Sequence, residues 1–135
     1  MAKSKNILSI VSLNCRGLND DKKRGKFFQQ IRDKGDIIML QETHGNAKTE
    51  LRWLRELGQG DMFFSHWAPN ARGVLTFISA KSEFKVVSIS EIVVGKDDQG
   101  RLLLVKGEFK GESFCIMNCY MPNLASTVQA REKYK

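Results

Sequence analysis

Short apolar runs alternate with segments of helical periodicity in the first part of this sequence. The run from Ile7 to Leu13 is apolar on both faces, which favours a central strand. A second apolar run, Asp36 to Glu42, follows a segment in which Phe27, Phe28 and Ile31 share one helical face. The connection is long enough for a crossover helix. The pattern therefore predicts a strand–helix–strand unit with parallel strands.

Two glycines are expected to follow helices. Gly35 supplies a stop for the first helix, which begins after the capping residues Asn19 to Asp21. Asn46 is placed to cap a second helix, in which a leucine row faces inward and after which Gly58 follows. The members of that row are Leu51, Leu54 and Leu57.

From residue 62 onward the pattern becomes strand-like, with short turns rich in Gly, Asn, Asp and Lys. The expected strands are Met62–Trp67, Val74–Ser79, Phe84–Val94, Leu102–Phe109 and Phe114–Tyr120. A last helix is expected from Ser126 or Thr127 and is cut off in mid-course. We therefore expect an α/β fold and a truncated domain over residues 1–135.

Composition narrows the class of protein. The chain is 41% hydrophobic and 27% charged, and no stretch is long enough to span a bilayer, so no membrane partner is expected. The net charge of +7 attracts polyanions, of which nucleic acid is the commonest. Cys15, Cys115 and Cys119 all lie in or beside apolar runs, which indicates buried, reduced thiols and an intracellular protein.

Polar residues with usable oxygen atoms stand where three apolar runs end. These residues are Asn14, Glu42 and Tyr120, with Asn123 just beyond the last of them. Sites in sheets with crossover connections form at the carboxyl ends of strands, and Mg²⁺ prefers such oxygen ligands. The plainer alternatives are a solvated loop glutamate, a turn-forming asparagine and a half-buried tyrosine.

Four segments carry a family resemblance in the right order. They read SLNCRGL at 12–18, DIIMLQETH at 36–44, RGV at 72–74 and NCYMPN at 118–123. Together they resemble the amino-terminal part of the endonuclease/exonuclease/phosphatase superfamily. The residues of the first two segments are most similar to those of the apurinic-type endonuclease domain of LINE (non-LTR) retrotransposons.

The resemblance implies a fold and a set of roles. The fold is a four-layer α/β sandwich, in which two packed mixed β-sheets are flanked by helices and each half of the domain contributes one sheet. Glu42 would bind Mg²⁺, with Mn²⁺ as an alternative, and Asn14 would sit beside it to orient the metal-bound water or the nucleophile. Tyr120 would hydrogen-bond the scissile phosphate, and Asn123 would help to hold that phosphate or its neighbour.

The chain departs from the family pattern at several points. Arg16 stands where repair members carry an acidic residue, and it either faces nucleic-acid phosphate or is an ordinary surface residue. The family's Gly-Asp-x-Asn motif and its Ser-Asp-His motif, which contains the general base, do not occur in the sequence. His44 and His66 are interpreted as structural or solvent-exposed. Asn70 and Arg72, before an expected strand, are candidates for contact with a nucleic-acid backbone.

The remaining basic and aromatic residues are expected to have structural roles or to face solvent, and not to bind nucleic acid. The basic run on the first helix is expected to be a solvated face. It consists of Lys22, Lys23, Arg24 and Lys26. Trp53 and Trp67 are expected to be packing residues rather than platforms for bases.

The sequence thus predicts a Mg²⁺-dependent DNA endonuclease, incomplete as given, that nicks a target for retrotransposition in the nucleus. A superfamily phosphatase acting on phosphoinositides is one alternative. A non-catalytic nucleic-acid-binding fragment is another. Truncation would expose the surface that the missing half normally covers, so self-association through that surface is expected.

Overall fold

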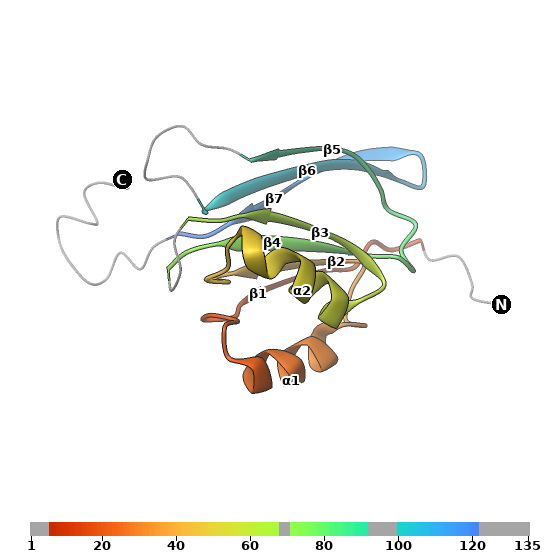
Figure 1. Ribbon diagram of the computed structural model, residues 1–135. Helices are drawn as coiled ribbons and strands as arrows, with labels where there is room; N and C mark the ends of the chain where they lie inside the picture. The colour runs from red at the N-terminus through yellow and green to blue at the C-terminus, as the bar shows by residue number, and fades with distance from the viewer. Residues whose placement is uncertain (1–5, 68–70, 92–99, 122–135) are drawn as a thin grey trace.

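The computed structural model describes residues 6–67, 71–91 and 100–121, which form a helical layer and two stacked sheets (Figure 1). The helices lie on one face of the first sheet and the second sheet lies on the other. The elements, in chain order, are β1 (Ile10–Asn14), α1 (Asp21–Ile31), β2 (Ile37–Gln41), α2 (Ala47–Leu57), β3 (Gly60–Ser65), β4 (Val74–Ser79), β5 (Lys85–Glu91), β6 (Leu102–Phe109) and β7 (Glu112–Cys119).

The first sheet has the order β1-β2-β4-β3. β1 and β2 are parallel neighbours in the sheet and α1 connects them in the sequence, so the predicted strand–helix–strand unit is confirmed. β4 pairs antiparallel with both β2 and β3. The prediction of a central first strand is wrong: β1 is an edge strand within the described ranges, and Ile10 and Leu13 are 45% and 36% exposed. Its apolar character reflects a surface that no described strand covers.

The two helices begin where the sequence places them. The Asp20 side chain accepts the Lys23 N–H at the start of α1, and Asn46 caps α2 as predicted. Gly35 is not the stop of α1, because that helix already ends at Ile31. Leu51 does not face inward as expected and is exposed.

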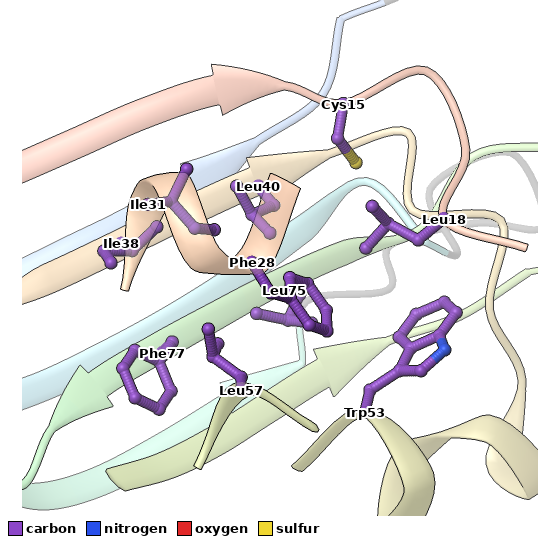
Figure 2. Close-up of a cluster of buried hydrophobic side chains, with 10 residues drawn as sticks. All are labelled: Cys15, Leu18, Phe28, Ile31, Ile38, Leu40, Trp53, Leu57, Leu75 and Phe77. Atoms are coloured by element: carbon purple, nitrogen blue, oxygen red, sulfur yellow. The ribbon is translucent and has the colours of Figure 1, made fainter. Parts of the chain in front are cut away.

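Trp53 and Leu57 carry the buried stripe of α2 instead, since they stand four residues apart on one helical face. Figure 2 shows them beside Phe28 of α1, over the strand residues of the first sheet. Trp53 is therefore a packing residue, as predicted. The full cluster consists of Cys15, Leu18, Phe28, Ile31, Ile38, Leu40, Trp53, Leu57, Leu75 and Phe77.

Arg24 corrects the expectation of a wholly solvated basic face on α1. Its side chain is buried and forms ion pairs with Glu56 of α2 and Asp21, while it donates to the Leu18 carbonyl oxygen. The guanidinium carbon also lies 5.9 Å from the centre of the Trp53 ring. The cation thus ties α1 to α2, whereas the lysines of the same run are exposed.

The second sheet, β5-β6-β7, is antiparallel throughout and packs on the first through Ile37, Ile78, Phe84, Val105 and Phe109. The α/β architecture with two packed sheets is confirmed, and the described residues supply three of the four expected layers. The chain contributes strands to both sheets, so the expectation that each half of the domain contributes one sheet is wrong.

Two cysteines also differ from expectation. Cys15 is buried as predicted, but Cys115 and Cys119 are exposed on β7. Side chains alternate between the two faces along a strand, and the buried Asn118 faces the first sheet. Cys115 and Cys119 therefore lie on the opposite face of the second sheet, which points away from the first. None of the helices in the described ranges is both long and apolar enough to cross a membrane.

Candidate active site

Strand ends from both sheets converge at one edge of the molecule. β1 and β2 end there, since Asn14 pairs with Gln41, and β4 begins there, since Gln41 pairs with Val74. In the second sheet β6 begins and β7 ends at the same edge. The loops at 15–18, 42–44, 72–73 and 100–101, together with residue 120, are called the site edge below.

A series of backbone hydrogen bonds joins these loops. Gly17 N–H donates to the Glu42 carbonyl oxygen at 2.6 Å, and Thr43 N–H donates to that of Gly73 at 3.1 Å. Gly73 N–H in turn donates to the Gly100 carbonyl oxygen at 2.9 Å, which carries the series from the first sheet to the second. The loops therefore hold fixed positions relative to one another.

Glu42 and Tyr120 meet at this edge although they come from different sheets. Tyr120 N–H donates to the Arg101 carbonyl oxygen at 2.8 Å, which extends the pairing of β6 with β7. Burial first, and then a hydrogen bond from the Tyr120 hydroxyl to the Glu42 carboxylate, raises the pKa of Tyr120. The positive charges of Arg101 and Arg72 act in the opposite direction. A carboxylate, a phenol and two guanidinium groups thus share one electrostatic environment.

The backbone at the site edge adopts conformations that are uncommon for residues with side chains. Arg16, Glu42, His44 and Arg72 all have positive φ angles, between 50° and 58°. Such angles persist where the surrounding structure enforces them, and they cluster at functional sites. Here inter-loop hydrogen bonds hold the backbone groups of Glu42, His44 and Arg72, and a local bond to Asn14 holds that of Arg16.

Gly73 permits the closest approach in this region. Its φ is +97°, and a β-carbon built on it would overlap Thr43 Oγ1. The Thr43 side chain is fully buried. Glycine is therefore required at this position both by its conformation and by the lack of space.

Asn14 and Arg16 lie beside Glu42 but make local contacts. The Asn14 carboxamide oxygen accepts the Arg16 N–H at 3.0 Å, so this asparagine forms the turn that the plainer interpretation describes. Both residues are exposed. Asn14 pairs with Gln41, and so it stands next to the strand end that carries Glu42.

A buried amide pair holds the two sheets together directly behind Glu42 and Tyr120. Gln41 Nε2 donates to Asn118 Oδ1 at 2.9 Å, and Asn118 Nδ2 lies 2.8 Å from the Leu75 carbonyl oxygen and 3.2 Å from that of Leu40. Asn118 belongs to β7, whereas its partners belong to β2 and β4. Sequence reasoning missed this pair, although each amide stands within two residues of a candidate site residue.

Arg101 was also missed. It is buried, it directly precedes β6, and its positive charge partly offsets the rise in the pKa of Tyr120. A basic residue at the start of an apolar strand, next to Gly100, was the signal available in the sequence.

Arg72, which the sequence marks as a candidate for contact with a nucleic-acid backbone, lies at the site edge. Its guanidinium carbon stands 4.1 Å from the centre of the Trp67 ring. Trp67 is 46% exposed, so the prediction that it is a packing residue is wrong. Asn70 and Asn123 lie outside the described residues.

The histidines make structural contacts, in agreement with the prediction. His66 Nε2 lies 2.7 Å from Glu50 Oε1, which connects the end of β3 to α2, and its ring lies 5.1 Å from that of Phe64. His44 packs against Gly17, where a β-carbon would come 2.7 Å from its Nδ1 atom.

The donor set at the site edge fits part of a site for a hard divalent metal ion. Mg²⁺ is usually bound through one or two carboxylates, with water and substrate phosphate completing the coordination. Glu42 supplies a half-buried carboxylate, and Asn14 supplies an amide oxygen beside it. No group of three or more His, Cys, Asp and Glu residues that could enclose a metal occurs in the described part of the chain.

Similarity to solved structures identifies the fold. The catalytic domain of Xenopus laevis APE2 matches 95% of this chain at 21% identity and a TM-score of 0.66. The AP endonuclease LMAP of Leishmania major matches 94% of it at 18% identity with a TM-score of 0.64, and a humanized D. rerio TDP2 matches 93% at 16% with a TM-score of 0.69. The chain has the endonuclease/exonuclease/phosphatase fold.

The superfamily resemblance of the sequence motifs is thus confirmed at the level of the fold. The chain spans about half of each solved structure, at 49%, 44% and 55% of their lengths in the same order. An uncharacterized 149 kDa protein of transposon TX1 from Xenopus laevis is 30% identical over 116 residues, which cover 85% of this chain and 8% of that protein. No family model matches the chain.

Proposed function

We propose that this chain is the amino-terminal part of a divalent-metal-dependent DNA endonuclease domain that nicks target sites for a retrotransposon. The observation that carries the proposal is the meeting of Glu42 and Tyr120, from different sheets, under the charges of Arg72 and Arg101. The similarity to a transposon protein over 116 residues supports the retrotransposon setting.

Each side chain of the site has a proposed task. Glu42 would hold Mg²⁺, or Mn²⁺ in its place, and Asn14 would help to orient the attacking water beside it. A divalent metal bound there would supply Lewis acidity toward a phosphate oxygen and would lower the pKa of a water molecule. Tyr120 donates a hydrogen bond to the scissile phosphate, while Arg72 and Arg101 offset the charge that grows on its oxygens. Asn123 is proposed to hold the same phosphate or its neighbour, and Arg16 and Asn70 to contact the strand nearby.

The proton acceptor for the attacking water is proposed to come from elsewhere in the domain. The His66 ring contacts the Glu50 carboxylate and the His44 ring packs against Gly17, so neither is proposed as the base. The family's base belongs to a Ser-Asp-His motif that the sequence lacks. The chain by itself therefore positions metal and phosphate but activates water slowly. A domain that nicks chromosomal DNA would work in the nucleus.

The open edge of β1 is the proposed surface for association. Ile10 and Leu13 are partly exposed on it, and no described strand pairs with its outer side. An exposed apolar edge strand favours pairing with further strands. In a longer chain these would be the remaining strands of the domain, and in the isolated half-domain they would come from a second copy.

Nicking of supercoiled plasmid, with imidazole added as a substitute base, tests the catalytic proposal. We expect slow nicking in Mg²⁺ or Mn²⁺ that rises with imidazole concentration and stops in EDTA. Glu42→Gln should abolish it and Tyr120→Phe should slow it. Glu112→Gln, an exposed change at the far end of β7, is the matched control and should leave the rate unchanged.

Three results would contradict this assignment. Salt-sensitive DNA binding without any imidazole-dependent nicking would make the chain a non-catalytic nucleic-acid binder. Release of phosphate from a soluble phosphoinositide, with the plasmid left intact, would favour the phosphatase alternative. Equal nicking by the wild-type and Glu42→Gln proteins would place the activity outside this site.

A further inference from the structure

Trp67 is an exposed indole at the end of the first sheet where β2 leads into Glu42, because it follows β3, whose last residue Ser65 pairs with Val74. It is 46% exposed, in contrast to Trp53, which has no exposed surface. The Arg72 guanidinium lies over its ring, with the guanidinium carbon 4.1 Å from the ring centre. A guanidinium stacked on an indole restricts the motion of both side chains, so this is an ordered aromatic surface.

The backbone under Trp67 is fixed by the site edge itself. A β-carbon on Gly100 would come 2.9 Å from the Trp67 β-carbon and 3.1 Å from its backbone nitrogen, so the two segments touch. Gly100 N–H donates to Ser65 Oγ at 3.1 Å, and the Gly100 carbonyl accepts from Gly73. Trp67 therefore lies against the hydrogen-bonded loops of the site edge, which also carry Glu42.

Arg72 connects the indole to the phosphate-binding groups. Its carbonyl oxygen accepts the N–H of His44, two residues after Glu42, and its charge acts on Tyr120. A strand with one phosphate at Tyr120 would bring an adjacent nucleotide toward the Trp67–Arg72 pair. Aromatic side chains next to cationic ones are the arrangement that holds unstacked bases in single-strand-binding proteins.

We propose that Trp67 and Arg72 form a stacking platform for an unpaired base adjacent to the phosphate bound at Tyr120. The proposal rests on the proposed function in that it takes nucleic acid as the substrate, and it specifies the class. A base inside a duplex has both faces covered by its neighbours and cannot stack on an indole unless it leaves the helix. The preferred substrate is therefore nucleic acid with at least one unpaired nucleotide next to the cleaved bond.

Tryptophan fluorescence tests this stacking in EDTA, without metal or cleavage. The probes are a single-stranded oligonucleotide and a base-free abasic tract of equal length. We expect the oligonucleotide to quench the exposed Trp67, while the abasic tract binds without quenching. Trp67→Phe leaves only the buried Trp53 and should lose the quenching. Quenching that persists in Trp67→Phe would overturn the proposal.

Affinity measured by anisotropy of labelled oligonucleotides gives the second test. Trp67→Ala should weaken binding of the base-containing strand about tenfold or more, and leave the abasic tract nearly unaffected. Arg72→Lys, which keeps the charge but loses the planar group, should also weaken the base-containing strand selectively. Equal weakening of both probes would show a charge contact only and would overturn the stacking proposal.

The outcome is separable from that of the proposed function. Glu42→Gln should retain full quenching, because stacking does not use the metal. Base-dependent quenching in a protein that never nicks DNA would leave the platform standing and refute the endonuclease. Nicking with no preference for a base-containing over an abasic probe would leave the endonuclease standing and refute the platform.

Discussion

Removal of the Asn118 side chain should loosen the contact between the two sheets. The carboxamide is buried and reaches Leu40, Leu75 and Thr76 through its nitrogen and Gln41 through its oxygen. An amide nitrogen carries only two hydrogens, so about three of these four contacts can be full hydrogen bonds at once. The same side chain sets the position of β7 two residues before Tyr120.

The magnitude follows from what the truncation leaves behind. Asn118→Ala strands at least one buried polar group, at about 1–3 kcal/mol, and opens a small cavity. Gln41 retains Ser12 Oγ at 3.0 Å, which limits the loss. We expect a decrease of about 3 kcal/mol in the free energy of unfolding, and a Tm lower by about 10 °C. Asn118→Asp should cost more at neutral pH, because it places a carboxylate against the carbonyl oxygens of Leu40 and Leu75.

Urea denaturation followed by circular dichroism measures these losses. The matched control is Asn14→Ala, which removes an exposed asparagine at the same edge and should cost about 1 kcal/mol or less. An Asn118→Ala protein within about 0.5 kcal/mol of wild type would refute the reasoning, since surface substitutions fall in that range. So would an Asn118→Asp protein as stable as Asn118→Ala at pH 7.

Three further predictions concern stability and association. Burial raises the pKa of the Cys15 thiol to about 12, so iodoacetamide at pH 8 should modify the two β7 cysteines and spare Cys15. Because the thiol ionises near 9.0 in the unfolded chain, the free energy of unfolding of the wild type should fall as the pH rises from about 9 to about 12. The fall should be less steep in Cys15→Ser. Equal alkaline slopes would contradict this. Gly73→Ala should lower the free energy of unfolding, measured in urea, by about 3 kcal/mol, because the residue has a left-handed backbone and a β-carbon would overlap Thr43. Gly111→Ala, which is also left-handed but in open space, should lower it less. Equal losses in the two variants would rule out the overlap. The isolated chain should associate as concentration rises in size-exclusion chromatography with light scattering, and Ile10→Lys should restore a monomer; a wild-type monomer at every concentration would contradict the account of the β1 edge.

The order and type of the elements could be predicted because each segment carries its own periodicity and caps. Asn46 stands before an amphipathic segment, and the run of Val74 to Ser79 forms a strand with the same bounds as the expected one. The place of β1 at an edge could not be predicted, because an apolar run does not reveal whether a neighbour covers it. Leu51 and Trp53 illustrate the same limit, since the direction of a helical face depends on the sheet it meets.

The candidate site divides in a similar way. Glu42 and Tyr120 could be expected at one edge because both follow strands, and the structure does bring them together. Arg101 and the Gln41–Asn118 pair could not, because their importance comes from the packing of two sheets whose register the sequence does not specify. Trp67 was misjudged because exposure is a tertiary property: its indole lies on the surface with Arg72 stacked against it.

Binding of Mn²⁺ to the ¹⁵N-labelled chain, followed by paramagnetic broadening of amide signals, tests the central claim most directly. If Glu42 is the metal ligand, substoichiometric Mn²⁺ should broaden the signals of residues around Glu42 and Asn14 first, and Glu42→Gln should abolish this broadening. Glu112→Gln should retain it, because that carboxylate lies at the opposite end of β7. Unchanged broadening in Glu42→Gln, or broadening centred away from the site edge, would contradict the account.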